Sequence, residues 1–421
     1  MALQTVNFID GHQTRRAQFA APKRLLHSTA LALVMAAMPM SLSAQVIWDG
    51  SSDTNWDDGT NWVGDAAPGG GDTAEFSDNT AVNQPTLNSD QSVAATTIST
   101  GILTIPNHLT SPTVAISGTG TVTVDTASGI LTSATGVTIT DSGTFNLVNS
   151  STLQGSATLS AGSSATFTLN GGLVTNDLTI NGGTANLTSG VVSGTTSVAA
   201  PVSVTNNATL SAVSNAGTFV NASTAGAVTN SGDGTNDGTI ASLSNTGGTF
   251  LNNDTITGGV DVSAGTVTNA ATGAMNGGAL VSGGALENAG QIAGDVSVTG
   301  GAFTLSDGSS VTVGAASGDV TIGNDSGAAT FVATGTSSIA GAFSVGAQGT
   351  ATVGDSVTPV ATALTVSGTT DVTGAGGNAA ALSVVGGATF NTGNVTVGSD
   401  GTLTVGDADA LTLENMNVGG G

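Results

Sequence analysis

The sequence contains no cysteine and no tyrosine, and only four of its 421 residues are basic. These four are Arg15, Arg16, Lys23 and Arg24, so no Lys or Arg follows position 24. A disulfide-stabilised fold is therefore excluded. The formal net charge is −24 at pH 7. The long segment without cations is expected to repel nucleic acid and anionic membranes.

Large apolar and charged side chains are also scarce. Aromatic residues make up 3% and charged residues 8% of the chain, both low for a globular domain. Small β-branched residues instead suit thin, repetitive β-structure. Intrinsic disorder is the alternative, because the chain is rich in Gly and Ser and carries a high net charge. The regular alternation of Val, Thr, Ile and Leu and a mean hydropathy of +0.24 favour folded β-structure.

The first 44 residues have the features of a secretory signal peptide. The basic residues precede a short apolar run at 31–38, and the small residues at 42–44 offer a cleavage position before Gln45. A membrane-spanning helix would need about 20 apolar residues. We therefore predict a helical signal peptide over 1–44. Its removal takes away Asp10, so 28 − 1 = 27 acidic residues and no cation remain, and the mature net charge is −27.

Beyond about residue 96 the sequence consists of short alternating segments separated by turn residues. The segments 120–125, 165–170 and 401–405 place Val, Phe or Leu on one side and mostly Thr on the other, as half-buried strands do. Gly, Asn-Gly and Asp-Gly units between such segments favour turns. No segment shows a sustained 3.6-residue apolar period, so we expect almost no helix after the signal peptide.

The strand segments recur as a repeat. Phe219, Phe250, Val267, Leu286 and Phe303 occupy equivalent positions, in steps of 31, 17, 19 and 17 residues. A step of about 17–20 residues with occasional longer loops predicts a solenoid whose coils each contain three short strands. Stacked coils would align apolar side chains, and Asn at matching turns would form hydrogen-bonded ladders. A Greek-key sandwich is the alternative, but the uniform texture without long connections favours the solenoid.

The segment 45–95 holds all three tryptophans and a cluster of acidic and turn residues. It contains Trp48-Asp-Gly, the Asn-Trp pairs 55–56 and 61–62, Pro68-Gly-Gly-Gly-Asp and Thr73-Ala-Glu-Phe. This pattern resembles the start of the passenger regions of autotransporters that carry autotransporter-associated β-strand repeats. The later Gly-Thr-Leu-Thr-Val strands resemble those repeats loosely. The resemblance implies a right-handed parallel β-helix outside a bacterial outer membrane, often with adhesive or biofilm roles.

The predicted fold is all-β: a signal peptide over 1–44, a Trp-containing cap over 45–95 and a right-handed parallel β-solenoid over 96–421. The open end of a β-helix exposes apolar side chains and unpaired backbone. Trp48, Trp56, Trp62 and Phe76 are therefore predicted to cover it, and a carbohydrate-stacking platform is the alternative. An autotransporter also needs an outer-membrane translocator barrel with aromatic girdles. Because the sequence has no such segment, we expect a fragment, export by another protein, or simple secretion, with the fragment preferred.

The sequence offers little for catalysis. Gly354–Val357 resembles the opening of GDSL esterases and 324–327 a serine-protease nucleophile, but both lack a suitable base, since His108 is the sole His after the signal peptide. We predict that both segments are turns and that His108 is a solvated loop residue. Polysaccharide lyases of β-helical fold would need Lys or Arg. A glycosidase needs two carboxylates about 5–10 Å apart, and only Asp57 and Asp58 cluster. We predict that the chain is not an enzyme.

Calcium is the metal for which the sequence offers ligands. Hard carboxylate oxygens suit Ca²⁺, although neither acidic segment matches an EF-hand loop. The alternative is that the acidic residues of both segments are solvated turn residues without a metal. The candidate ligands are Asp49, Asp53, Asp57 and Asp58 in the first segment and Asp233 and Asp237 in the second.

These observations predict a secreted protein or one at the bacterial outer-membrane surface. It would act as an adhesin or spacer through an extended face, by repeated weak contacts and without catalysis. Its expected partners are a host or matrix surface or sibling cells, with an outer-membrane translocator supplied outside this chain and no nucleic acid. The alternatives are a Ca²⁺-bridged, self-assembling surface-layer or matrix protein and a β-helical glycosidase.

Overall fold

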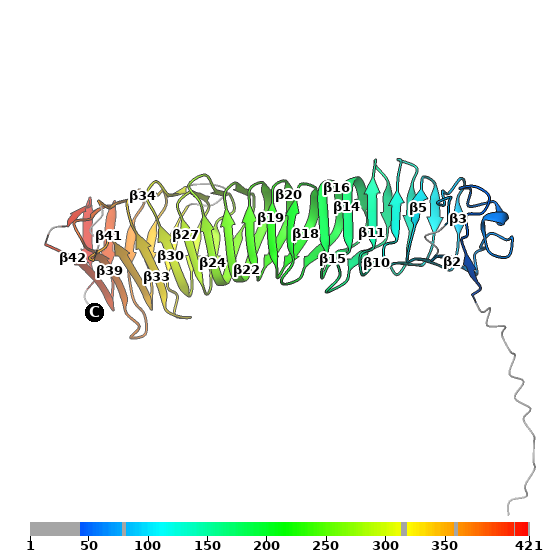
Figure 1. The fold of residues 1–421 in the computed structure, drawn as a ribbon. Helices are drawn as coiled ribbons and strands as arrows, with labels where there is room; N and C mark the ends of the chain where they lie inside the picture. The colour runs from blue at the N-terminus through cyan, green and yellow to red at the C-terminus, as the bar shows by residue number, and fades with distance from the viewer. Residues whose placement is uncertain (1–42, 78–80, 313–317, 358–360, 408, 420–421) are drawn as a thin grey trace, which may run out of the picture. The chain divides into compact units, whose positions relative to one another are not determined.

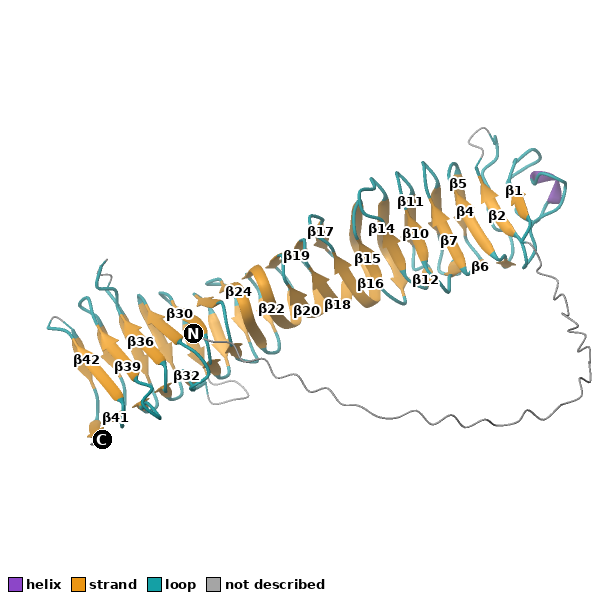
Figure 2. Cartoon of the chain, turned by 90° about the horizontal axis from the view of Figure 1, so that it is seen from below, coloured by secondary structure: helices purple, strands orange, loops and turns teal. Residues whose placement is uncertain are grey.

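The computed structural model describes residues 43–77, 81–312, 318–357, 361–407 and 409–419. The predicted signal peptide lies outside these residues except for its last two positions. The described part forms 44 β-strands and one short 3₁₀ helix, η1 (Gly59–Asn61), drawn in purple in Figure 2. All pairings between the named strands are parallel. The predicted all-β solenoid is therefore confirmed, with about 18 coils, and a Greek-key sandwich is excluded.

Successive coils stack side by side (Figure 1). Each strand pairs with the equivalent strand of the next coil, so the strands form three columns along the stack. The first column forms an uninterrupted series of paired strands from β5 to β42. Its strands are β5 (Ile102–Ile105), β8 (Thr121–Val124), β11 (Thr144–Val148), β14 (Thr166–Val174), β16 (Thr184–Val198), β17 (Ser203–Asn206), β19 (Thr218–Asn221), β21 (Asp233–Asn236), β22 (Thr239–Asn252), β24 (Val260–Asn269), β27 (Ala285–Asn288), β30 (Gly301–Leu305), β33 (Ala329–Ala333), β36 (Gly349–Val353), β39 (Ala380–Val384) and β42 (Gly401–Val405).

The second column consists of shorter strands, and parts of β14, β16 and β22 also belong to it because these long strands continue around a corner of the coil. Its other strands are β3 (Gln91–Ser92), β6 (His108–Thr110), β9 (Ile130–Thr132), β12 (Thr152–Gln154), β18 (Thr209–Asn215), β20 (Thr224–Asn230), β23 (Thr255–Ile256), β25 (Ala274–Met275), β28 (Gln291–Ala293), β31 (Ser310–Thr312), β34 (Thr336–Ile339), β37 (Ala363–Val366), β40 (Thr389–Asn391) and β43 (Ala410–Thr412).

The third column begins inside the segment predicted as the cap, and parts of β16, β18, β20, β22 and β24 also pass through it. Its other strands are β1 (Gln45–Ile47), β2 (Thr73–Phe76), β4 (Ala95–Ile98), β7 (Thr113–Ile116), β10 (Val137–Ile139), β13 (Ala157–Leu159), β15 (Leu178–Ile180), β26 (Ala279–Val281), β29 (Val296–Val298), β32 (Val320–Ile322), β35 (Phe343–Val345), β38 (Thr370–Val372), β41 (Asn394–Val397) and β44 (Asn415–Val418).

The alternation of side chains in each strand creates a continuous core inside the coils. In β8, for example, Val122 and Val124 are fully buried, while Thr121 and Thr123 are half-buried and point outward. Identical or similar apolar side chains then stack from coil to coil. The rings of Phe145 and Phe167 lie 5.8 Å apart in paired positions. Each coil has too few apolar residues for a core of its own, so the core depends on stacking.

The 31-residue step of the repeat is two coils and not one coil with a long loop. Phe219 pairs with Gly234, and Gly234 pairs with Phe250, so the coils here contain only 15 and 16 residues. Gly234 occupies the place of an apolar side chain in this column. A Cβ on Gly234 would lie 2.3 Å from Cδ2 of Phe250. The glycine therefore leaves the space that the phenylalanine ring of the next coil fills.

Buried asparagines form two ladders, as predicted. Within each ladder the side-chain amide of one Asn donates to the amide oxygen of the Asn in the next coil, at 2.7 to 2.8 Å. The shared bond satisfies polar groups that would otherwise be costly to bury. The first ladder consists of Asn206, Asn221, Asn236, Asn252, Asn269 and Asn288, and the second of Asn215, Asn230 and Asn245.

The tryptophans pack together next to the first coils. Trp48, Trp56 and Trp62 are each at most 2% exposed. The ring of Trp62 lies 5.0 Å from that of Trp48 and 4.8 Å from that of Trp56, in edge-to-face arrangements, and Phe76 joins the cluster. The indole N–H of Trp62 donates to the carbonyl oxygen of Trp56, and that of Trp48 to Asn83. Because the indole faces are covered, they offer no platform on which a sugar ring could stack.

In the described part of the chain, no helix is long and apolar enough to cross a membrane.

Candidate functional site: a groove across five coils

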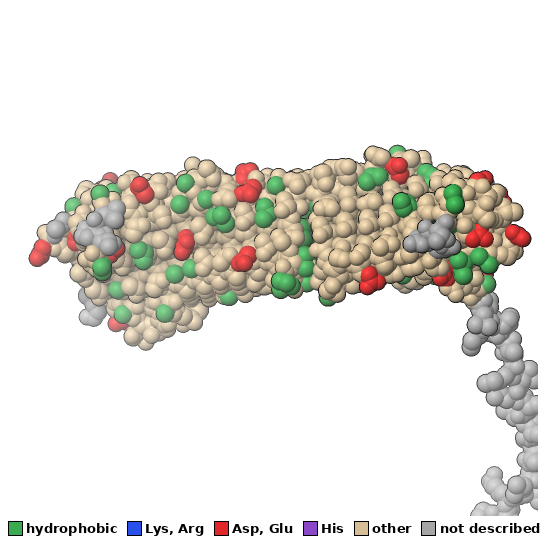
Figure 3. All heavy atoms as spheres, in the orientation of Figure 1, with side chains coloured by type: hydrophobic (Ala, Val, Ile, Leu, Met, Phe, Trp, Pro, Cys, Tyr) green, Lys and Arg blue, Asp and Glu red, His purple; other side chains and the backbone are tan. Residues whose placement is uncertain are grey.

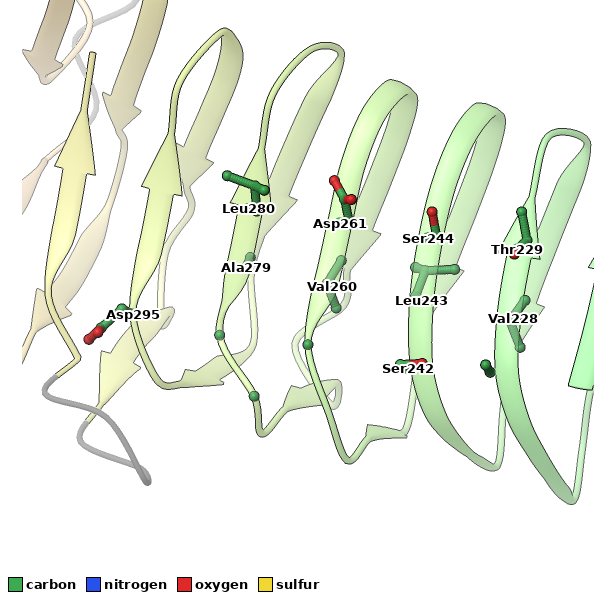
Figure 4. Close-up of a pocket in the computed structure, with 14 residues that line it drawn as sticks. Val228, Thr229, Ser242, Leu243, Ser244, Val260, Asp261, Ala279, Leu280 and Asp295 are labelled. Atoms are coloured by element: carbon green, nitrogen blue, oxygen red, sulfur yellow. The ribbon is translucent and has the colours of Figure 1, made fainter. Parts of the chain in front are cut away.

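A shallow groove of about 510 Å³ crosses the third column between β20 and β29 (Figure 4). Two rows of residues along the stack form it. Each member of the first row comes one residue before an inward-pointing residue of the column, and the row consists of Ala227, Ser242, Gly259, Gly278 and Asp295. The second row points outward from the strands and consists of Thr229, Ser244, Asp261 and Leu280.

The first row makes the groove because most of its members have small or absent side chains. Gly278 adopts a positive φ of +72°, and a Cβ there would lie 2.3 Å from the carbonyl oxygen of Asp295. A Cβ on Gly277 would meet the backbone of Gly258 at 2.3 Å. The close approach of neighbouring coils therefore requires glycine at these corners. Asp295 follows them and closes one end of the groove.

The groove presents oxygen atoms and one apolar side chain. Thr229 and Ser244 contribute hydroxyl groups, and Asp261 contributes an exposed carboxylate. Asp295 is also exposed, and one of its oxygens accepts a hydrogen bond of 2.9 Å from the backbone N–H of Asp319. Leu280 is 41% exposed and supplies the apolar contact. Such a lining suits a ligand that carries hydroxyl or amino groups next to an apolar edge.

The groove contains no arrangement for nucleophilic catalysis. Its lining includes no His, Lys, Arg or Cys, so neither serine has a base beside it. Asp261 and Asp295 are the two carboxylates. They belong to different rows and lie two coils apart, which is about 10 Å along the stack at the ordinary spacing of strands.

A smaller hollow of about 330 Å³ lies at the corners that precede β11 and β14. It is lined by the residues 140–142 and 160–164, which are mostly serines and other small residues. The hydroxyls of Ser142 and Ser164 lie 2.9 Å apart and bond to each other. We therefore regard this hollow as a feature of the corner turns.

The acidic residues of the first predicted calcium site all lie between β1 and β2. Asp49 accepts a hydrogen bond from the N–H of Ser51 at 3.0 Å. Asp53 accepts bonds from the N–H of Asn55 and the side-chain amide of Asn61, both at 2.7 Å. These two carboxylates therefore close local turns.

Asp57 and Asp58 also bind neighbouring residues. Asp57 accepts from the hydroxyl of Ser89 at 2.8 Å and from the side-chain amide of Gln91. Asp58 precedes η1 and accepts from the hydroxyl and the N–H of Thr60, at 2.7 and 3.0 Å. The Thr60 hydroxyl is the largest cause that lowers the pKa of Asp58.

The residues of the second predicted calcium site lie in the short coils around Gly234. Asp233 begins β21 and accepts a 2.7 Å bond from the hydroxyl of Thr249 in the next coil. Asp237 follows β21 and accepts a 2.7 Å bond from the side-chain amide of Asn253. Among the residues that the structure describes, no three His, Asp or Glu side chains group as a metal site would require. Calcium binding stays a prediction.

The predicted turn at the esterase-like segment is confirmed. The residues 354–357 follow β36 outside any strand, and the residues 324–327 lie between β32 and β33. The prediction for His108 is wrong, because His108 begins strand β6, is half-buried and contacts the Thr132 hydroxyl through Nε2 at 2.8 Å. Its place in a strand follows from its pairing with Ile130 in the next coil.

The groove residues escaped the sequence analysis. The sequence signal that could have indicated the groove is a pair of glycines, at 258–259 and again at 277–278. Each pair directly precedes a short strand segment, 260–262 and 279–281. Without the register of the coils, nothing indicates that these pairs are neighbours or that Asp295 is aligned with them.

The outer surface around these features is dominated by small polar side chains. Figure 3 shows one face of the molecule, on which acidic side chains are scattered and not gathered into one patch. Comparison of the chain with protein-family models, with curated proteins and with solved structures finds no match in any of the three.

Proposed function

We propose that this protein is a secreted or cell-surface β-helical passenger that acts as an adhesin or a structural spacer, without catalysis. The observation that carries the proposal is the uninterrupted stack of parallel coils from β1 to β44 with small polar side chains outside. Such a stack resists bending and offers a long surface with repeated binding positions. Repetition converts weak contacts into firm attachment.

The groove between β20 and β29 is the part of this surface that we propose as the adhesive contact. Its hydroxyl groups, its two carboxylates and Leu280 would meet hydroxyl- or amine-bearing groups on a host surface, a matrix or a sibling cell. The remaining coils would hold the groove away from the cell. This division combines the adhesive and the spacer role in one chain.

Retention of protein-coated beads tests the adhesive role. Beads that carry the purified full-length protein are expected to stay on cells and matrix under flow better than uncoated beads. The double variant Asp261→Asn with Leu280→Ser should lose most of this retention. The matched control is Asp233→Asn, which changes an exposed carboxylate of the same solenoid outside the groove. Equal retention of coated and uncoated beads would contradict the adhesive role. Only the role of a structural spacer would then remain.

Location is tested separately with whole cells. A surface protein is expected to be degraded by added proteinase K while the cells stay intact. Trypsin is the matched control protease, because the sequence has no Lys or Arg after position 24 and the mature chain offers no cleavage site. Survival of the protein under proteinase K, with degradation only after lysis, would contradict surface display.

The second candidate is a Ca²⁺-bridged surface layer or matrix. It is favoured by the exposed carboxylates of a chain in which no cation follows position 24, because a divalent cation could bridge two such chains. Light scattering with added Ca²⁺ and then with a chelator distinguishes the candidates. Only a layer protein is expected to assemble reversibly with calcium, and Mg²⁺ serves as the control cation.

The third candidate is a glycosidase. It is the weakest of the three, because it is supported only by the presence of Asp261 and Asp295 in one groove. Incubation with a panel of polysaccharides, followed by an assay for reducing ends, tests it. If no polysaccharide of the panel releases sugar, the glycosidase candidate is ruled out.

A further inference from the structure

The outward side of the first column carries an ordered array of hydroxyl and amide groups. Two rows run side by side across β8, β11, β14 and β16, and each position pairs directly with the next coil. We call these eight residues the threonine face. They are Thr121, Thr144, Thr166 and Thr184 in the first row and Thr123, Asn146, Thr168 and Asn186 in the second.

The spacing of this array follows from the parallel strands. Neighbours within a row are about 4.8 Å apart, and the two rows, which are two residues apart along each strand, are separated by about 6.6 Å. The pairing is regular at all eight residues of the face. The register shifts begin further along the strands, after Leu147 in β11 and after Leu169 in β14. The pairing of Leu187 with Asn206 extends both rows to Ser203 and Thr205 in the next coil.

The side chains of the face are held in place from below and from the side. Thr is restricted at χ1 because it is branched at Cβ. Beneath the face, Phe145 and Phe167 are fully buried and stack on each other, which fixes the backbone of β11 and β14. Along the second row, the amide of Asn146 donates to the hydroxyl of Thr123 at 3.3 Å. The hydroxyl groups therefore keep a regular spacing.

The threonine face is uncharged although the chain is strongly acidic. None of its eight residues is acidic, and the nearby carboxylates of Asp125, Asp141 and Asp177 lie outside the four strands that carry it. This composition does not favour a cationic partner. A protein partner is also not favoured, because binding hot spots are rich in Trp, Tyr and Arg and poor in Ser and Thr. The face also offers no aromatic ring on which a sugar could stack, because in the described residues the Trp and Phe side chains are all buried.

We propose that the threonine face binds the surface of ice. Each hydroxyl forms a hydrogen bond with a water molecule, and the fixed spacing of the hydroxyls arranges these waters in a regular layer. The Thr methyl groups between them favour an ordered layer over a mobile one, because they form no hydrogen bonds with water. Such a layer matches a crystalline water surface. This inference concerns the solenoid itself and does not depend on its display on a cell.

Partition into slowly grown ice tests the proposal with the purified full-length protein. Ice is grown in a dilute solution, and the protein in the melted ice and in the remaining liquid is measured by tryptophan absorbance. The wild-type protein is expected to be enriched at least several-fold in the ice relative to serum albumin. Thr166→Lys, in the middle of the first row, should reduce the enrichment to the albumin level. Thr158→Lys is the control, because Thr158 is a half-buried outward threonine of β13 in the third column.

Circular dichroism before the partition shows that both variants remain folded. If the Thr166 variant is unfolded, Thr184→Lys replaces it, since Thr184 is exposed on the same face. Exclusion of the wild-type protein from ice, or equal enrichment of the face and control variants, would overturn the proposal. Binding to insoluble cellulose or chitin that is lost in the face variant, without enrichment in ice, would also overturn it and assign the face to a sugar.

Discussion

At the scale of single residues, Gly234 determines how the shortest coils fit together. The site of its missing side chain is filled by the ring of Phe250, at a distance that a Cβ could not tolerate. Gly234→Ala is expected to lower the stability by about 1–3 kcal/mol through overpacking. Thermal unfolding of the variant measures this loss.

Two variants check the explanation for Gly234. Gly71→Ala is the control, because nothing lies within 4 Å of a Cβ at that position, and it should leave the melting temperature almost unchanged. The double variant Gly234→Ala with Phe250→Leu should lose less stability than the sum of the losses of the two single variants. The reason is that the smaller leucine side chain relieves the clash with the new Cβ. Strict additivity of the two effects would argue against this contact.

Asn236 is the second decisive residue, in the middle of the longer asparagine ladder. Its side chain accepts a bond from Asn221 and donates one to Asn252, both at 2.8 Å, and it is fully buried. Asn236→Ala removes both bonds and leaves the amide oxygen of Asn252 without its donor. We expect the free energy of unfolding to fall by about 1–3 kcal/mol. Chemical denaturation should show a much smaller effect for Asn253→Ala, whose side chain bonds to an exposed carboxylate. Similar losses for both would contradict a special role of the ladder.

At the scale of elements, the tryptophan cluster joins the loops between β1 and β3 to the first coils. Trp62 contacts Trp48, Trp56 and Phe76, so its removal should open the whole cluster. Trp62→Ala is expected to cost about 3–5 kcal/mol and to increase aggregation, because apolar side chains and strand edges of the first coils become exposed. Val63→Ala is the matched control, since Val63 is 59% exposed.

Acrylamide quenching of tryptophan fluorescence reports on the same element. All three indoles are buried, so quenching of the wild-type protein should be weak, and it should become much stronger in the Trp62 variant. If light scattering and quenching both stay unchanged after the substitution, the cluster does not act as a cap.

At the scale of the whole molecule, the carboxylates repel one another. The 28 acidic residues less Asp10 leave 27 carboxylates after position 44, and no Lys or Arg is present there to form an ion pair. Salt screens this repulsion. The melting temperature is therefore expected to rise from low to physiological ionic strength, as measured by circular dichroism with a monovalent chloride salt. A fall of the melting temperature with salt would contradict this account.

Local alternation in the sequence was sufficient to predict the class of fold. The Thr-Val-Thr-Val pattern of 121–124 buries one side of a strand and exposes the other, whatever the neighbouring coil. Recurrent Asn was sufficient to predict the ladders, because Asn in equivalent positions of stacked coils places donor next to acceptor. These predictions needed only the residues of one coil and the knowledge that coils repeat.

Only the tertiary structure decided the register of the coils, and with it the groove and the threonine face. Gly234 has no apolar side chain, so the repeat could not be counted through it from the sequence. His108 carries a polar ring, yet pairing with Ile130 places it in a strand. Asp295 and Gly278 meet because they directly precede Val296 and Ala279, which pair in neighbouring coils. The physical reason is that parallel pairing joins residues between 15 (233 − 218) and 31 (381 − 350) positions apart, and no local pattern specifies that separation.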